Sequence, residues 1–158
     1  MDEIKLEPMT AEMYHSFFRE YQNDPDLYLN KSDYVEYMYD PKKVDEYIER
    51  QVQKQRLPFA IMCGNEIIGE LKLYDIVDGK SATLGIALKN SLWTNRGFGT
   101  RAEKLAVEYV FRTMDIPTLY ADTVLTNTRS QHVLEKVGFQ YTHADDCKKY
   151  YRITRKPH

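Results

Sequence analysis

The sequence predicts a mixed α/β domain of the α+β type, in which about four helices flank a mostly antiparallel central sheet of about seven strands. Short runs of alternating apolar residues indicate strands, and apolar residues at helical spacing indicate helices between them. Glycine, proline and aspartate turns separate these segments. The 158 residues contain no repeat or linker, so we expect one domain spanning residues 1–158.

The first third of the chain is predicted to form one strand and two helices. Residues 4–7 alternate as a strand does, and Thr10 can cap the helix that follows. Residues 23–40 have no clean period and indicate a long loop with at most one helical turn, a feature that in compact domains is often functional. Asp40 and Pro41 are typical of a helix start. The inward stripe of that helix is expected to contain Val44, Tyr47, Ile48, Gln51 and Val52.

The middle of the chain is predicted to form a three-stranded meander and a long helix. Residues 59–74 have the pattern of a hairpin, and residues 82–88 form the third strand. Apolar residues then recur at helical spacing over residues 102–114. Thr100 and Glu103 match a capping box, which predicts the start of that helix.

The last third is predicted to contain a strand at residues 119–125, a short helix and two closing strands. Thr128 and Gln131 repeat the capping-box pattern at the start of the helix, and Gly138 supplies its left-handed C-terminal cap. The closing strands are expected at residues 140–144 and 148–154.

Composition excludes several classes of function. The net charge of −2 provides no basic field for nucleic acid, so no nucleic-acid partner is expected. Cys63 and Cys147 lack metal-ligand spacing, which argues against a metal site and for two free thiols in a reducing cytoplasm. No apolar run approaches the ~20 residues that span a bilayer, and the first residues lack the apolar region of a secretory signal. We therefore expect a cytoplasmic protein without a membrane partner.

Thirteen tyrosines are unusual for this length, and they gather in residues 28–47 and 141–151. Tyrosine can fill the half-wet rim of a core. Alternatively, aromatic walls with hydroxyl tips would suit a small organic amine or a peptide end. Both interpretations are open at the level of sequence.

A glycine turn stands between the strand at residues 82–88 and the long helix, in the stretch 95–100. Gly97 and Gly99 let the backbone pass close to a ligand without interference from a Cβ atom. The first turn of the helix then offers unpaired N–H groups and the positive end of its dipole, which suit a phosphate. A plain connection between strand and helix is the alternative.

The glycine turn and the segment 127–139 together resemble the GNAT superfamily of acyl-CoA-dependent N-acetyltransferases. The nearest resemblance is to the branch that acetylates ribosomal-protein N-termini, in which Asn-x-x-Ser is followed by Glu-Lys-x-Gly-Phe, as in this segment. The resemblance implies an enzyme that uses acetyl-CoA as co-substrate. It also makes a homodimer an expectation, because family members often dimerise.

The resemblance also implies which residues hold coenzyme A. Backbone amides of the glycine turn would bind the pyrophosphate, and the preceding strand would offer backbone groups to the pantetheine arm. Asn127 would reach the pantetheine, although it can equally serve as a helix cap or turn residue. The implied cofactor residues are therefore Ile86, Ala87, Leu88, Asn95, Arg96, Gly97, Phe98, Gly99, Thr100 and Asn127.

The sequence departs from the family pattern at two positions. Thr94 stands where the family has a long polar side chain before the glycines. Leu134 stands where many members have a proton-donating tyrosine. These losses support an alternative function, a CoA-binding sensor or partner-binding module without transferase activity. A dinucleotide-binding domain is excluded because the chain has no G-x-G-x-x-G and no alternating parallel strand–helix order.

Acetyl transfer requires a neutral amine and a proton for the leaving thiolate. Deprotonating a lysine-like amine at pH 7 costs about 4 kcal/mol, whereas an α-amino group costs about 1 kcal/mol, so a carboxylate acting through water can serve as base. Glu70 and Asp122 are candidate bases by location, although either can face solvent. The branch points to Ser130 as the acid, with a serine bonded to its own backbone as the alternative. The acceptor, a peptide N-terminus or a small amine, is not identified.

Overall fold

The computed structural model describes residues 3–157, which form seven strands and four α-helices in the predicted order. Single 3-10 turns at Pro25–Leu27, Lys31–Asp33 and Ser91–Trp93 interrupt the connections. The strands are β1 (Ile4–Pro8), β2 (Leu57–Cys63), β3 (Glu66–Val77), β4 (Ser81–Leu88), β5 (Thr118–Val124), β6 (Gln140–Ala144) and β7 (Lys148–Thr154). The helices are α1 (Ala11–Glu20), α2 (Pro41–Gln53), α3 (Phe98–Thr113) and α4 (Thr128–Val137).

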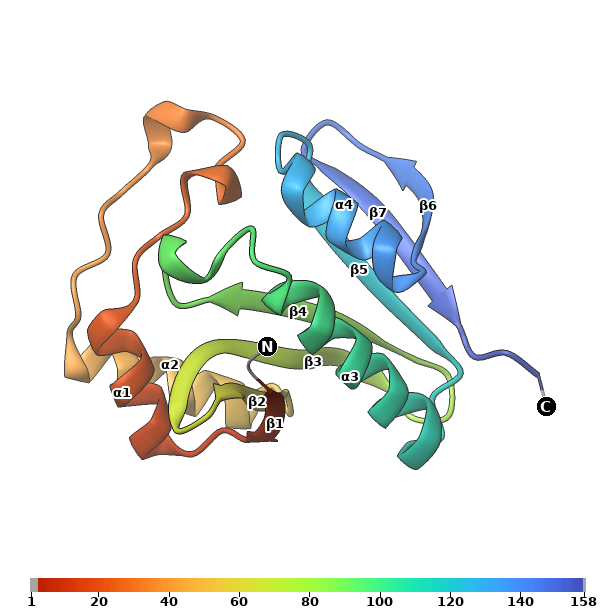
Figure 1. Ribbon diagram of the computed structural model, residues 1–158, viewed down its shortest axis with the longest axis horizontal. Helices are drawn as coiled ribbons and strands as arrows, with labels where there is room; N and C mark the ends of the chain where they lie inside the picture. The colour runs from red at the N-terminus through yellow and green to blue at the C-terminus, as the bar shows by residue number, and fades with distance from the viewer. Residues whose placement is uncertain (1–2, 158) are drawn as a thin grey trace.

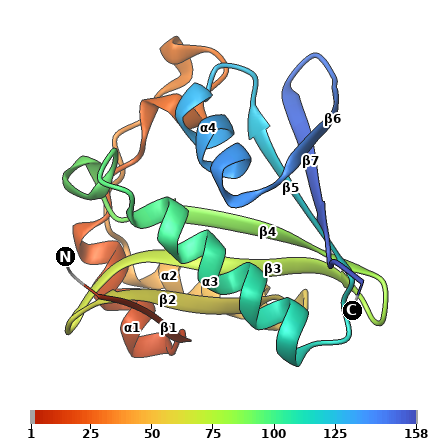
Figure 2. The ribbon, with the colours of Figure 1, turned by 45° about the vertical axis from the view of Figure 1, so that its right-hand side comes forward.

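All seven strands join one sheet in the order β1-β2-β3-β4-β5-β7-β6. Every neighbouring pair is antiparallel except β4 and β5, which confirms the mixed, mostly antiparallel sheet. β4 and β5 pair only at Ser81–Thr83 with Thr118–Tyr120. Beyond these residues the two strands diverge, and Figures 1 and 2 show the sheet opening between them.

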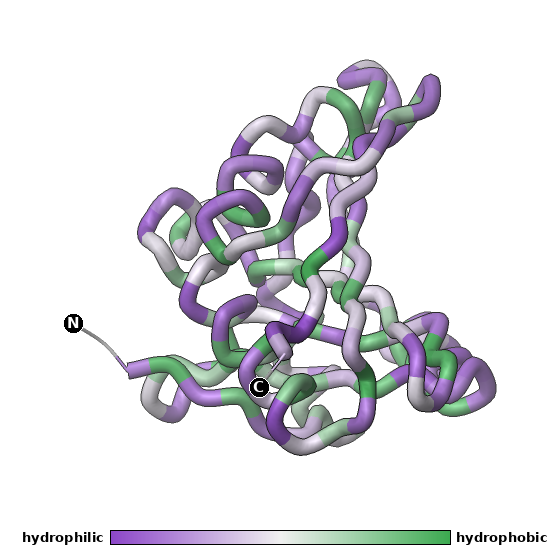
Figure 3. Tube along the Cα trace, turned by 90° about the vertical axis from the view of Figure 1, so that its right-hand side faces the viewer, coloured by the Kyte–Doolittle hydropathy of each residue, from purple (hydrophilic) through white to green (hydrophobic). Residues whose placement is uncertain are grey.

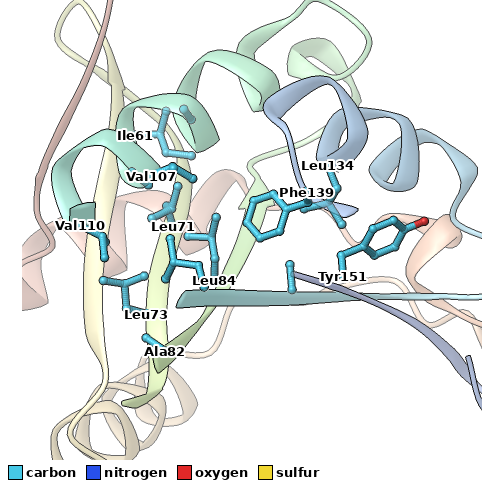
Figure 4. Close-up of a cluster of buried hydrophobic side chains, with 14 of the residues drawn as sticks. Ile61, Leu71, Leu73, Ala82, Leu84, Val107, Val110, Leu134, Phe139 and Tyr151 are labelled. Atoms are coloured by element: carbon cyan, nitrogen blue, oxygen red, sulfur yellow. The ribbon is translucent and has the colours of Figure 1, made fainter. Parts of the chain in front are cut away.

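The helices lie on both faces of the sheet. α3 and α4 cover one face, and α1 and α2 lie together on the other (Figures 1 and 2). Figure 4 shows the main core between α3 and the strands, where Leu71, Leu73 and Leu84 meet Val107 and Val110. The core continues under α4, in a group formed by Leu134, Phe139 and Tyr151. Buried apolar surface thus holds both halves of the opened sheet in place.

Hydropathy follows the predicted periods along most elements, and Figure 3 shows hydrophilic and hydrophobic residues alternating along the chain. Thr10 caps α1, since its Oγ1 accepts a hydrogen bond from the N–H of Met13. Asp40 caps α2 with Pro41 in the first turn, as predicted. Gly138 ends α4 in the left-handed region with φ of 116°. These local signals identify the elements correctly because each satisfies backbone groups at a helix end.

Both predicted capping boxes are wrong. α3 begins at Phe98 after Gly97, and no side chain caps it, so Thr100 lies inside the helix. α4 is capped by Asn127. Gln131 instead donates from Nε2 to the carbonyls of Val124 and Leu125 at 3.3 and 3.1 Å. In each case a backbone turn or a neighbouring asparagine starts the helix earlier than the motif predicts.

The predicted stripe of α2 is wrong at Val52, which is 73% exposed, whereas Val44 and Gln51 are buried. The predicted loop at residues 23–40 is confirmed as a long connection, but it contains two 3-10 turns instead of one, because the side chains of Asp24 and Asn30 each cap a turn. Of the helices in residues 3–157, none is both long enough and apolar enough to cross a bilayer.

Candidate active site

The opened edge of β4 is the central feature of the site. The N–H of Lys89 donates to the carbonyl of Ile68 on β3 at 2.7 Å. Because backbone groups of an antiparallel strand point alternately to its two edges, Ala87 also faces β3, whereas Ile86 and Leu88 face the other edge. That edge has no strand partner beyond Thr83. The N–H and C=O groups of Ile86 and Leu88 are therefore available to an extended ligand.

A large cavity of about 1080 Å³ occupies the opening between β4 and α4. The start of α3, the start of α4 and the loop after α1 also contribute to its walls. We call it the cofactor cavity. Eight of the ten predicted cofactor residues line it, and Arg96 and Phe98 do not. The eight are Ile86, Ala87, Leu88, Asn95, Gly97, Gly99, Thr100 and Asn127.

The turn before α3 has the conformation that the glycines suggest. Asn95 and Gly97 have φ of 59° and 82°, in the left-handed region that asparagine and glycine adopt most readily. The first intrahelical bond joins the N–H of Arg101 to the carbonyl of Gly97 at 3.1 Å. The N–H groups of Phe98, Gly99 and Thr100 therefore have no acceptor within the helix, and Gly99 and Thr100 line the cavity, where an anion could accept from such groups.

The side chain of Arg96 does not serve this cavity. Its guanidinium donates to the carbonyl of Leu92 at 2.8 Å and stacks against the rings of Trp93 and Phe98. Phe98 is buried in the core. Thr94 lines the cavity, and its hydroxyl donates to the carbonyl of Ser91 at 3.1 Å. The binding capacity of the turn thus lies in its backbone.

Asn127 and Ser130 lie at the opposite wall. Asn127 is buried, and its Oδ1 accepts from the N–H of Ser130 at 3.2 Å, so it does cap α4. With Oδ1 engaged, the Nδ2 group retains the capacity to donate to a ligand. Arg129 also lines this wall, and it forms ion pairs with Asp24 and, at 3.4 Å, with Asp26. Sequence reasoning missed this tie between α4 and the loop.

Glu103 also differs from its predicted role as the second residue of a capping box with Thr100. It lies one turn into α3, is 3% exposed and lines the cofactor cavity instead of capping the helix. Burial raises the pKa of its carboxyl to about 8. At neutral pH the carboxyl therefore holds its proton for most of the time and places little negative charge beside the turn.

A second cavity of about 660 Å³ lies on the other face of the sheet, between β3, β4, α1 and α2. We call it the acceptor cavity. Five residues line both cavities: Tyr21, Asn23, Tyr37, Ile86 and Ala87. The two spaces therefore meet at the end of β4, on either side of its opened edge.

Glu70 lies in the acceptor cavity and is 5% exposed. Tyr14 donates a hydrogen bond to its Oε2, and Tyr47 donates to its Oε1 at 2.8 Å. Burial and the charge of Glu70 raise the pKa of both phenols, which keeps them protonated as donors. Lys72 extends the network by donating from Nζ to the Tyr47 hydroxyl at 3.0 Å.

The sequence analysis did not predict this hydrogen-bond network around Glu70, but the alternation of residues along β3 could have indicated part of it. Glu70, Lys72 and Tyr74 alternate along β3, which places them on one face of the sheet. The phenols that bind Glu70 come from α1 and α2, distant in sequence, so no local pattern announces them.

Asp122, the other candidate base, lines neither cavity. Its Oδ1 pairs with Lys148 Nζ at 3.1 Å on the strand beside it.

Across the described part of the chain, no cluster of three or more histidine, cysteine or acidic side chains is arranged to hold a metal ion. Leu134, the departure from the family tyrosine, is buried in the core under α4.

Comparison with known proteins places this geometry among acetyltransferases. The family model described as "Acetyltransferase (GNAT) domain" matches residues 3–140. A curated relative, the probable N-acetyltransferase YjcK of Bacillus subtilis (strain 168), is 30% identical over 102 residues. That match spans 62% of this chain and 56% of YjcK, so this chain corresponds to little more than half of that relative.

Two solved structures share the fold. AAC(6')-Ib in complex with ribostamycin and coenzyme A is 20% identical, with a TM-score of 0.76 over 98% of this chain and 94% of that chain. The ribosomal L7/L12 α-N-protein acetyltransferase RimL in complex with coenzyme A is 14% identical, with a TM-score of 0.76 over 96% of this chain and 94% of that chain. At these identities the likeness establishes the fold and nothing finer.

Proposed function

The chain belongs to the GNAT acetyltransferase family, and on that premise we propose that it is an acetyl-CoA-dependent N-acetyltransferase. It moves the acetyl group from the thioester to a primary amine by direct attack. The observation that carries the proposal is the meeting of two cavities at the end of β4, where Ile86 and Ala87 line both. One cavity has the features of an anionic, extended donor site, and the other contains a buried carboxylate.

The donor is proposed to lie in the cofactor cavity. Backbone N–H groups from Asn95 to Thr100 would hold its pyrophosphate, because they combine outward amides with the positive end of the α3 dipole. The N–H and C=O groups of Ile86 and the C=O of Leu88 would pair with the amide groups of the pantetheine arm as a strand would. Asn127 would add a side-chain donor from α4.

Glu70 is the base that the geometry favours. It lines the cavity from which an amine would approach, whereas Asp122 lies outside both cavities and is ion-paired. The amine nitrogen forms a bond to the thioester carbonyl carbon and passes its proton to Glu70, directly or through a water. The N–H of Leu88 on the free edge would stabilise the oxyanion.

The leaving thiolate needs a proton when the C–S bond breaks. Leu134 cannot donate one, so the residue proposed is Ser130, which lines the cofactor cavity at the start of α4. Its hydroxyl gives a proton to the thiolate and recovers one from solvent. Both the amide product and free coenzyme A are then complete.

A specific observation favours the second candidate, a CoA-binding module without transfer activity. Two positions that family members use are altered here, since Thr94 is short and Leu134 is apolar. Calorimetry with acetyl-CoA and a thiol-release assay with a panel of amines and peptides separate the two functions. Binding with turnover supports the transferase, binding with no turnover supports the module, and no binding overturns both.

The catalytic assignment is tested by Glu70→Gln, which keeps the size of the side chain and one acceptor oxygen for a tyrosine hydroxyl but replaces the base by a neutral amide. We expect kcat to fall by about 10²–10⁴-fold, with acetyl-CoA affinity unchanged. Asp122→Asn is the matched control and should leave kcat close to that of the unsubstituted chain. If Asp122→Asn lost activity and Glu70→Gln retained it, Asp122 would be the base and Glu70 would not.

A further inference from the structure

The charges that line the acceptor cavity are unevenly distributed. Four cations, Lys43, Arg50, Arg56 and Lys72, line it together with one carboxylate, Glu70. The chain as a whole has a net charge of −2, so this excess of positive charge is local. A pocket built to receive a polycation would have the opposite balance, because like charges across a partly desolvated space repel.

These cations lack direct ion pairs with carboxylates in the part of the chain that the structure describes. None of the four forms an ion pair within 4.0 Å of a carboxylate in residues 3–157. Arg50 and Arg56 stack against the rings of Tyr47 and Tyr74 at 5.9 and 5.7 Å. Stacking on an aromatic face holds a guanidinium in place and leaves its N–H groups able to bind an anion.

Lys72 is held at the floor of this cavity. Its Nζ donates to the Tyr47 hydroxyl, which in turn donates to Glu70. Burial lowers the pKa of the Lys72 ammonium, and the attraction of Glu70 compensates only in part. An anionic ligand beside Lys72 would supply the missing compensation, because it favours the charged form of a desolvated amine.

The two charged groups that would bind the ends of an acceptor lie close together, since Glu70 Oε1 and Lys72 Nζ are 2.8 and 3.0 Å from the same Tyr47 hydroxyl. Glu70 lies opposite Ala87, where the cavities meet, and Lys72 lies opposite Gly85, two residues farther along. The Cα atoms of Glu70 and Lys72 are therefore about 7 Å apart, and their side chains converge on the Tyr47 hydroxyl. Gly85 keeps this floor open, because a Cβ there would lie 3.2 Å from the ring of Tyr74.

We propose that the acceptor of this chain is a primary amine that carries an anionic group, a carboxylate or a phosphate, on a short linker. Glu70 receives the amine, and Lys72 and Arg56 bind the anion. Hydroxyls of the lining tyrosines add neutral donors, since burial raises the pKa of Tyr21 and of Tyr74 to about 12. This inference rests on the proposed transferase function and adds the class of its substrate.

The test compares acceptors that differ only in the charge of the distant group. The series is 5-aminopentanoate, its neutral N-methylamide and 1,5-diaminopentane, with 3-aminopropyl phosphate to separate phosphate from carboxylate. Thiol release from acetyl-CoA gives kcat/KM for each. We expect at least tenfold higher kcat/KM for the anionic amines than for the other two, and the better anion identifies the source.

Variants connect the preference to the named cations. Arg56→Gln and Lys72→Met should each reduce the preference for the anion at least fivefold, mainly through KM, and Arg56→Glu should shift it toward 1,5-diaminopentane. Lys42→Met, on the exposed side of α2 beside Lys43, is the matched control and should leave the preference in kcat/KM for the anionic amines unchanged. Calorimetry of acetyl-CoA binding confirms that each variant is folded and loaded.

The possible results separate the anionic acceptor from the transferase activity on which it depends. Turnover of all the amines with equal kcat/KM, or an unchanged preference in both Arg56→Gln and Lys72→Met, overturns the anionic acceptor and leaves the transferase intact. Faster turnover of 1,5-diaminopentane also overturns it. Acetyl-CoA binding without turnover of any amine overturns the transferase, and the inference with it.

Discussion

Two buried ionisable residues near the site illustrate how burial changes the chemistry of a side chain. Lys89 is 2% exposed, and burial works against its charge, but hydrogen bonds from its Nζ to Glu20 and Glu66 at 2.8 and 2.7 Å outweigh that effect and raise its pKa. Glu103 is 3% exposed, and its pKa is raised by burial alone. Lys89 therefore stays charged, whereas Glu103 is neutral below pH 8.

Glu103 should make stability depend on pH. Its folded pKa of about 8 lies above the ordinary value of 4.5, so its contribution is complete below pH 4.5 and is lost as pH rises through 8. The shift corresponds to about 5 kcal/mol as an upper bound. Glu103→Gln should reduce the fall in unfolding free energy between pH 5 and 9, as measured by urea denaturation. Glu108→Gln, exposed on the same helix, is the control, and an equal pH slope in both variants would contradict the assignment.

At the scale of elements, the junction between β4 and α3 joins the strand edge to the helix end. β4 ends at Leu88 and α3 begins at Phe98, and the turn between them contains Asn95 and Gly97 in the left-handed region. This turn aims the first N–H groups of α3 at the cofactor cavity. A strained turn would change that direction even if the helix itself survived.

Gly97→Ala should therefore weaken acetyl-CoA binding. At φ of 82° an alanine is strained by about 1–2 kcal/mol, although no atom lies within 4 Å of the added Cβ. Relief of that strain would rotate the turn, and we expect Kd for acetyl-CoA to rise by about 5–20-fold in calorimetry. Gly64→Ala is matched in φ, at 60°, and in open surroundings, but it lies in the β2–β3 turn. It should lower Tm similarly with Kd unchanged, and an equal change in Kd would sink the interpretation.

At the scale of the whole molecule, the site exists because the sheet opens. The β5, β7 and β6 half with α4 diverges from the β1–β4 half with α3, and the loop at residues 23–40 lies across the opening (Figure 2). Arg129 on α4 pairs with Asp24 and Asp26, so the loop is tied to the diverging half. This loop and the preceding end of α1 contribute to the walls of both cavities.

Asp24→Asn should loosen the loop and leave the fold intact. Asparagine keeps the cap that Asp24 Oδ1 provides to the N–H of Asp26, but it removes the ion pair with Arg129. Since both partners are partly exposed, the loss in stability should be below about 1 kcal/mol. Hydrogen exchange of residues 23–40 should nevertheless accelerate several-fold. Asp33→Asn, in the same loop, should leave exchange unchanged, and indistinguishable rates in the two variants would refute the tie.

Much of the candidate site could be predicted from sequence. The glycine turn and the Asn127–Phe139 segment carry a family resemblance, and the residues that this resemblance implies for the cofactor include eight that line one cavity. The turn and the helix start themselves could be predicted because they are encoded locally. Arg96 and Phe98 could not be separated from them, since side-chain direction in a turn depends on neighbours such as Trp93. Glu70 and Asp122 were equal candidates by location, and only packing placed one inside a cavity.

The order of the elements and the family could be read from the chain alone, because each depends on short-range patterns of hydrophobicity, glycine and helix caps. The way in which β4 parts from β5, and the way in which α1, α2 and β3 surround Glu70, follow from the packed structure. Tyr14 and Glu70 are 56 residues apart, and the cations of the acceptor cavity come from α2, β3 and the segment between α2 and β2. Contacts at such separations follow from packing of the sheet faces, which no local pattern specifies.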